Sequence, residues 1–187
     1  MRTALVVDDE PMIRRQVAET LVRYGFDEIL EAENGKEALD IATARKPVLI
    51  VMDVSMPVLD GITAAEKIGK QAPVPIVLLT GTADGETVER ARLAGVMSYV
   101  VKPFREPQVY AAIDLAIHHF VEVSTLREEV ATLKDTLETR KMIEKAKGVL
   151  MKGGITEPEA YRKMQKIAMD KRKSLKEVAE AILLMEG

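Results

Sequence analysis

Five short apolar segments recur along the first part of the chain, and their spacing constrains the fold more than any other feature. The longer ones are rich in Val, Ile and Leu and do not alternate with polar residues, which is typical of strands buried on both faces of a parallel sheet. The segments are residues 4–7, 28–30, 48–52, 75–79 and 98–101, and helical patterns fill residues 11–24, 35–45, 60–70 and 84–94 between them. This alternation predicts an α/β fold with a doubly wound, five-stranded parallel sheet.

Acidic residues stand where two of these strands end. Asp8 and Asp9 follow the first apolar segment, and Asp53 closes the third. In doubly wound sheets the functional site lies beyond the carboxyl ends of the strands, and strands one and three should be neighbours there. Three carboxylates at close quarters repel one another unless a cation neutralises them, and hard oxygen ligands suit Mg²⁺. We therefore expect a magnesium site at this edge.

Two further polar side chains follow the fourth and fifth strands. Thr80 comes after the fourth segment and Lys102 after the fifth. Taken singly, each has an ordinary explanation, since a threonine can be a turn residue and a lysine a surface charge. An acid after a strand is likewise often a helix cap. Together, at the correct strand ends, they favour a site that holds a phosphoryl group.

Four segments, VVDDEP, LIVMDVSMPVLDG, LLTG and SYVVKPF, resemble in order and spacing the signatures of the response-regulator receiver domain. The resemblance covers residues 1–121 and implies a flavodoxin-like fold. It implies that Asp53 is the phosphoacceptor, and that Asp8 and Asp9 hold Mg²⁺ together with Asp53 and the backbone carbonyl of Ser55.

The resemblance also assigns the remaining site residues. It implies that Thr80 hydrogen-bonds the acyl phosphate, that Lys102 pairs with it, and that Tyr99 changes position on activation. It implies a cis peptide bond between Lys102 and Pro103 and a sensor histidine kinase as phosphoryl donor. Such a domain is a phosphoacceptor switch that promotes only its own phosphorylation and dephosphorylation, so we expect no enzyme of the ordinary kind.

A long helix is predicted after the receiver-like part. Residues 108–147 contain neither glycine nor proline, and apolar residues step by three and four as in a heptad seam. The seam consists of Val123, Leu126, Val130, Leu133 and Leu137. We favour a parallel homodimeric coiled coil over residues 122–139. The alternative is that this stripe packs within its own chain.

The charge is divided unevenly along the chain. Residues 140–187 contain twelve Lys and Arg against seven Asp and Glu, although the whole chain has a net charge of −3. A basic segment attached to an acidic body indicates an anionic partner for that segment. Two capping-box sequences, TEPE at 156–159 and SLKE at 174–177, predict two short helices there. With the end of the long helix they should form a small all-α unit of three helices.

The stretches IEKAKGVLM and GITEPEAYRKMQKIAMDKRKSLKEVAEAIL resemble the ANTAR domain, the RNA-binding output module of transcription antiterminators, over residues 140–187. The resemblance implies binding to RNA stem-loops that prevents transcription termination. RNA loops are recognised by basic groups on phosphates and by aromatic side chains on splayed bases. The candidate contacts are Lys145, Lys147, Gly148, Lys152, Tyr161, Arg162, Lys163, Lys171, Arg172 and Lys173.

Other functions stay open or are disfavoured by composition. A DNA-binding response regulator and a phosphorylation-dependent protein adaptor are the two alternatives. The chain has no cysteine and only two histidines, which disfavours thiolate metal sites and histidine-based catalysis. It has no apolar run long enough for a membrane span, and we expect a cytoplasmic protein.

Overall fold

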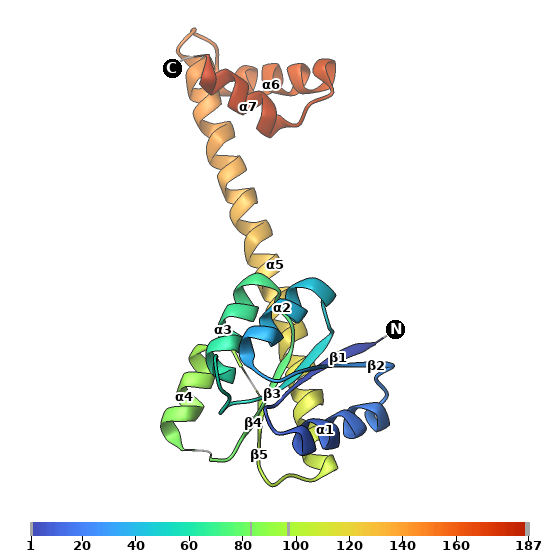
Figure 1. The fold of residues 1–187 in the computed structure, drawn as a ribbon. Helices are drawn as coiled ribbons and strands as arrows, with labels where there is room; N and C mark the ends of the chain where they lie inside the picture. Colours follow the sequence, from blue (N-terminus) through green and yellow to red (C-terminus); the bar gives the residue numbers. More distant parts are fainter. Residues whose placement is uncertain (1, 83, 97, 186–187) are drawn as a thin grey trace. The chain divides into compact units, whose positions relative to one another are not determined.

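A computed structural model describes residues 2–82, 84–96 and 98–185 (Figure 1). The chain forms two compact units, Met1–Ser124 and Thr125–Gly187. The boundaries expected from the sequence, at residues 121 and 139, remain a prediction.

The first unit is built on a five-stranded parallel sheet. Its strands lie in the order β2-β1-β3-β4-β5, so β1 pairs with both β2 and β3. The predicted doubly wound parallel sheet is confirmed, and the order reverses between β1 and β3, where such folds place their site. The strands are β1 (Thr3–Val7), β2 (Glu28–Ala32), β3 (Leu49–Asp53), β4 (Ile76–Thr80) and β5 (Ser98–Val101).

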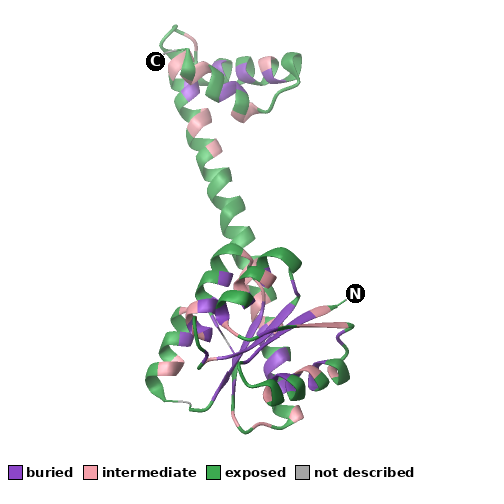
Figure 2. Cartoon of the chain, in the orientation of Figure 1, coloured by how far each residue is buried: buried purple, intermediate pink, exposed green. Residues whose placement is uncertain are grey.

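Helices cover both faces of this sheet. Side chains of α1 and α5 pack on one face together with Ala4 and Val6, while α2, α3 and α4 pack on the other with Leu5 and Val7. Alternate residues of β1 thus point into two separate cores, which explains the unbroken apolar sequence of the buried strands (Figure 2). The helices are α1 (Pro11–Tyr24), α2 (Gly35–Arg45), α3 (Gly61–Gln71), α4 (Gly85–Leu93) and α5 (Glu106–Met151).

Helix α5 is continuous over 46 residues, about 70 Å at the usual rise. Near its start, Val109 and Ile113 are fully buried against the sheet. Further along, most of the predicted seam is uncovered, and Leu133 is 67% exposed. Val123 is partly buried, whereas the other seam residues, Leu126, Val130, Leu133 and Leu137, are exposed within the described part of this chain (Figure 2).

The second unit is a small three-helix core. The end of α5 packs with α6 (Glu157–Lys171) and α7 (Leu175–Leu184) around Ala146, Met164 and Ala179. Both predicted capping boxes are present: the Glu159 carboxylate accepts from the Thr156 backbone N–H at 2.8 Å, and Glu177 does the same for Ser174.

Of the helices in the described residues, none is long and apolar enough to cross a membrane.

Candidate functional site

Lys102 joins two acidic residues at the carboxyl edge of the sheet. Its Nζ lies 2.8 Å from Oδ2 of Asp8 and 2.6 Å from Oδ1 of Asp53. Asp8 follows β1, Asp53 ends β3 and Lys102 follows β5, after which the predicted cis peptide bond to Pro103 is present. The Asp8 and Asp53 side chains are 0% and 6% exposed, and that of Lys102 is 18% exposed. The topology therefore brings together residues that are far apart in the sequence.

Backbone amides hold both carboxylates in place. The other oxygen of Asp8 accepts from the N–H of Glu10 at 2.9 Å, and the other oxygen of Asp53 accepts from the N–H of Ser55 at 2.7 Å. Each carboxylate therefore directs one oxygen at the backbone and one at Lys102. This arrangement fixes the orientation of Asp53, the predicted nucleophile.

The charges in this cluster do not balance. Burial raises the pKa of Asp53 and the charge of Asp8 adds to this; together they outweigh the lowering by the hydrogen bond and charge of Lys102 and by the Ser55 N–H. Burial alone would lower the pKa of Lys102, but its hydrogen bonds to Asp53 and Asp8 outweigh burial and raise it. One ammonium shared by two buried carboxylates leaves a net negative charge. Such a site attracts a further cation.

The residues fit Mg²⁺ by the chemistry of their donors. Asp8 and Asp53 supply buried carboxylate oxygens, and the neighbouring Asp9 is exposed. Within residues 2–82, 84–96 and 98–185, no three His, Cys, Asp or Glu side chains converge as a complete ligand set. Mg²⁺ itself often binds through one or two carboxylates and keeps several waters.

Thr80 ends β4 and Tyr99 lies within β5, and no hydrogen bond joins either side chain to Asp8 or Asp53 among the described contacts. The Thr80 hydroxyl donates to the carbonyl of Thr82 at 2.5 Å and accepts from its N–H at 3.2 Å. Tyr99 is 45% exposed. The main chain links the two strands here, because the N–H of Lys102 donates to the Thr80 carbonyl at 2.7 Å. Neither side chain reaches the carboxylates in this conformation.

Two residues of the site were missed from sequence. Arg14 is buried, and its guanidinium donates to the Asp8 carbonyl at 2.8 Å as well as to Glu31 and Glu33. A side chain at Gly61 would stand 2.0 Å from the Asp53 carbonyl oxygen, so only glycine fits there. A signal existed for Arg14, which shares a helix face with buried residues at i+3 and i+7. None singled out Gly61, since α2 and α4 also begin with glycine.

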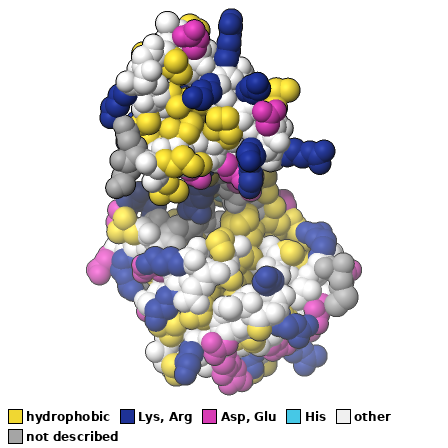
Figure 3. Space-filling view, turned by 90° about the horizontal axis from the view of Figure 1, so that it is seen from above, with side chains coloured by type: hydrophobic (Ala, Val, Ile, Leu, Met, Phe, Trp, Pro, Cys, Tyr) yellow, Lys and Arg dark blue, Asp and Glu magenta, His cyan; other side chains and the backbone are white. Residues whose placement is uncertain are grey.

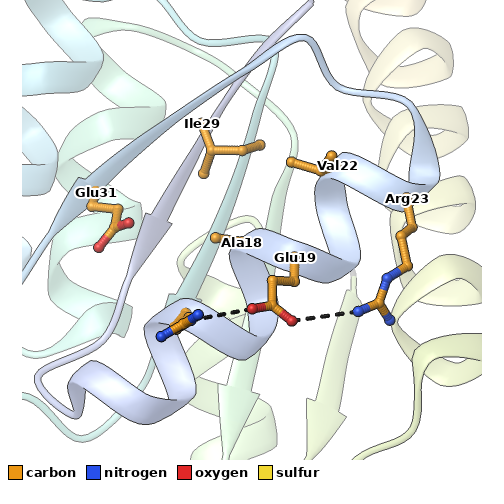
Figure 4. A pocket seen from close by; sticks show the side chains of 7 residues that line it. Ala18, Glu19, Val22, Arg23, Ile29 and Glu31 are labelled. Carbon is orange, nitrogen blue, oxygen red and sulfur yellow. Dashed lines mark hydrogen bonds and ion pairs between the residues drawn. The ribbon is translucent and has the colours of Figure 1, made fainter.

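A surface hollow of about 370 Å³ lies elsewhere, between α1 and β2 (Figure 4). It has an apolar floor that includes Val22 and Ile29, and Glu19 at its rim pairs with Arg15 and Arg23 at 3.2 and 3.4 Å. None of the predicted site residues lines it. Its only link to the acidic cluster among the described contacts is Glu31, which pairs with Arg14, whose guanidinium donates to the Asp8 carbonyl.

In the second unit, one predicted RNA contact is not on the open surface. Lys147 is buried, and its Nζ lies 2.7 Å from Glu144 and 2.6 Å from Glu157. Tyr161 is 38% exposed, and the Lys147 ammonium stands 6.0 Å from its ring centroid. A side chain at Gly148 would meet nothing within 4 Å, so the glycine makes no packing contact and leaves the helix surface open.

The other predicted contacts are exposed. Lys173 pairs with Glu177 at 2.7 Å, and Arg172 ends α6 in the left-handed conformation with φ of 52°. On the face seen in Figure 3, Lys and Arg side chains are interspersed with apolar ones. The exposed predicted contacts are Lys145, Gly148, Lys152, Tyr161, Arg162, Lys163, Lys171, Arg172 and Lys173.

Comparisons with known proteins match both units. The family model for the response regulator receiver domain matches residues 4–114, and that for the ANTAR domain matches residues 131–183. The transcriptional regulatory protein PdtaR of Mycobacterium tuberculosis is 47% identical over 183 residues, which is 97% of this chain and 89% of that protein.

Relatives of the first unit alone include chemotaxis proteins. The chemotaxis protein CheY of Bacillus subtilis is 35% identical, over 61% of this chain and 96% of its own length. The solved structure of Vibrio cholerae CheY4 superposes with a TM-score of 0.57 at 31% identity, covering 61% of this chain and 97% of that one. The chain therefore belongs to the response-regulator family and carries a receiver domain followed by an ANTAR domain.

Proposed function

We propose that the chain is a phosphorylation-controlled RNA-binding antiterminator of a two-component system. The proposal for the first unit is carried by Lys102, which is held between Asp8 and Asp53 at the carboxyl edge of a receiver sheet. The phosphoryl donor is a sensor histidine kinase, as for the family. The expected location is the cytoplasm.

The carboxylate of Asp53 acts as the nucleophile that accepts the phosphoryl group. Asp8, Asp9, Asp53 and the backbone carbonyl of Ser55 would hold Mg²⁺, which supplies charge neutralisation for the carboxylates and the incoming phosphoryl oxygens. The ammonium of Lys102 already contacts Asp53 and would pair with a phosphoryl oxygen carried there.

Activation then requires two side chains to move. The Thr80 hydroxyl leaves the carbonyl of Thr82 and donates to the new anion, and the half-exposed Tyr99 turns inward. The contacts of Thr80 within its own loop supply the resting state of this switch. The charge on Asp53 biases the equilibrium between the two arrangements.

The output is RNA binding by the second unit. The observation that carries this step is the exposed basic set around Gly148 and Tyr161, in a unit that matches the ANTAR model. Lysines and arginines there would contact phosphates, and the exposed Tyr161 ring would stack on an unpaired base. Binding to stem-loops upstream of a terminator would prevent termination.

Dimerisation couples the two units. The uncovered seam of α5, with Leu126 and Leu133 more than half exposed, would be buried in a parallel coiled coil of two chains. Two linked ANTAR units bind paired stem-loops with an avidity far above that of one unit. Control of dimerisation by phosphorylation is then sufficient to control output.

Competition between nucleic acids tests the RNA-binding step. A labelled stem-loop, enriched from a randomised-loop pool by the full chain, is competed with unlabelled stem-loop and with duplex DNA at fixed salt. We expect the stem-loop to compete far better. Preference for the duplex would favour a DNA-binding regulator instead.

Molecular mass in solution tests the dimer. We expect the mass of the chain treated with beryllofluoride and Mg²⁺ to double relative to a Leu133→Lys variant, and stem-loop affinity to fall in that variant. Lys134→Gln, an exposed change beside the seam, is the matched control. A wild-type chain that is monomeric both with and without beryllofluoride and Mg²⁺ would rule out the coiled coil.

A further inference from the structure

Lys147 links two helices of the second unit through a pair of carboxylates. Glu144 precedes it by one turn on α5, and Glu157 is the first residue of α6. Both carboxylates lie within hydrogen-bond distance of the Lys147 ammonium, at 2.7 and 2.6 Å. Because Glu157 is ten positions further along the chain, the lysine ties the start of α6 to the end of α5.

The same contact fixes the aromatic side chain of α6. Tyr161 lies four residues after Glu157, hence on the same face of that helix. Its ring centroid is 6.0 Å from the Lys147 ammonium, within the range of a cation–π interaction. The neighbouring Ala160 is fully buried, which sets the rotation of α6 about its axis. Lys147 therefore contacts the turn that precedes Tyr161 and lies at cation–π distance from its ring.

Exposure shows which groups of this cluster face solvent. The Lys147 side chain is 9% exposed, whereas those of Glu144 and Glu157 are 68% and 62% exposed. A phosphate approaching Lys147 would first meet the two exposed carboxylates, whose negative charge repels it. Two of the three N–H donors of the ammonium are already used by these carboxylates. This is a poor geometry for a backbone contact with RNA.

We propose that Lys147 is a positioning residue that presents Tyr161 for base stacking and makes no phosphate contact. This inference rests on the proposed RNA-binding function and assigns different roles to two of its residues. The phosphate contacts fall to the exposed lysines and arginines, among them Lys163 on α6. The exposed carboxylates keep phosphates away from the stacking position.

A double-mutant cycle tests whether Lys147 acts through Tyr161. The affinity of the full chain for the enriched stem-loop is measured for wild type, Lys147→Met, Tyr161→Ala and the double variant. We expect Lys147→Met to weaken binding by roughly tenfold, the order of one lost stacked base. In the Tyr161→Ala background the same change should weaken binding less than twofold. Independent, multiplying losses would overturn the proposal.

The salt dependence of binding tests the second half of the proposal. Loss of one phosphate contact lowers the slope of log affinity against log salt by about 0.7 for single-stranded RNA. We expect Lys147→Met to leave this slope unchanged. Lys163→Met removes the same charge from an exposed position without touching Tyr161 and is the matched control, with a lower slope. A slope reduced by Lys147→Met would overturn the proposal.

Two further variants at Lys147 separate loss of the ion pairs from loss of folding. Lys147→Arg can still bridge both carboxylates and should bind within about threefold of wild type, since a guanidinium offers at least as many donors. If Lys147→Met does not fold, judged by circular dichroism, the same cycle is run with Lys147→Gln. A wild-type chain that binds no stem-loop overturns the proposed function and this inference together, whereas a changed slope overturns this inference alone.

Discussion

Each unit of the molecule contains one lysine shared by two carboxylates, and the two clusters differ in which partner is buried. In the receiver unit, Asp8 and Asp53 are buried around Lys102. In the ANTAR unit, the lysine is buried and the carboxylates of Glu144 and Glu157 are exposed. The lysine–carboxylate distances are similar in the two clusters, but in one the negative groups are shielded from water and in the other the positive group is.

The difference shows how burial decides the role of an ion pair. Buried carboxylates cannot exchange their partner for water, so the receiver cluster depends on a cation and responds when charge is added to it. Exposed carboxylates are solvated whether or not the lysine is present. The first cluster is suited to a chemical switch and the second to holding two helices together.

The largest expected effect is loss of phosphorylation in Asp53→Asn. An amide cannot act as the nucleophile, so labelling by radioactive acetyl phosphate with Mg²⁺ should disappear. Asp40→Asn, an exposed change on α2, should label like wild type. Labelling of Asp53→Asn at the wild-type level would mean that another residue is phosphorylated. The contrast between a switch cluster at Lys102 and a structural cluster at Lys147 would then fail.

A second prediction compares removal of each lysine. Lys102→Met leaves two buried carboxylates without a cationic partner and should destabilise the receiver unit by about 3 kcal/mol in the absence of Mg²⁺. Native-state hydrogen exchange of the β3 amides measures this, and added Mg²⁺ should restore part of the loss. Lys67→Met, at an exposed position on α3, is the control.

Hydrogen exchange of Lys147→Met in the ANTAR unit is the matching measurement for Lys102→Met. Lys147→Met should speed exchange in the first turn of α6 and leave Met164 and its neighbours in the core protected, because the freed carboxylates are already in water. If Lys102→Met were as mild as Lys147→Met, burial of the carboxylates would not be what separates the two clusters.

At high pH the receiver unit should lose stability through Tyr24. Burial raises the pKa of Tyr24 to about 12, and a hydrogen bond to Asp114 on α5 adds to this. A raised folded-state pKa means a contribution that is fully present below the unfolded value of about 10 and is lost as pH rises through about 12. A phenolate absorbance titration should show a step near pH 12 that Tyr24→Phe removes. Persistence of that step would assign it to another tyrosine.

At low pH the smallest effect is expected, in the ANTAR unit. The hydrogen bond from Lys173 lowers the pKa of Glu177 to about 2, and the backbone and hydroxyl of Ser174 assist. Its contribution is present above the unfolded value of about 4.5 and is lost as pH falls through about 2. Carbon-13 NMR titration of the Glu177 carboxyl measures this. An ordinary value would mean that the capping box is not held in solution.

The sequence predicted the elements better than the contacts between them. Helix α1 begins and ends as expected because Pro11 favours its first turn, and Gly25, with φ of 111°, ends it. The meeting of Asp8 and Asp53 also followed from sheet topology alone. Lys147 was different: its spacing placed it on a helix surface, but its burial depends on Glu157, whose position is set by how α6 packs. Periodicity along one helix carries no such information.

The open space beside Gly148 makes it possible to test how closely a bound ligand approaches the α5 backbone. A methyl group there would meet nothing in the unliganded protein and would favour the helix by about 1 kcal/mol. Any affinity lost in Gly148→Ala must then come from atoms that a ligand brings to that spot. The affinity of Gly148→Ala relative to wild type therefore reports whether bound RNA contacts the helix backbone at this position.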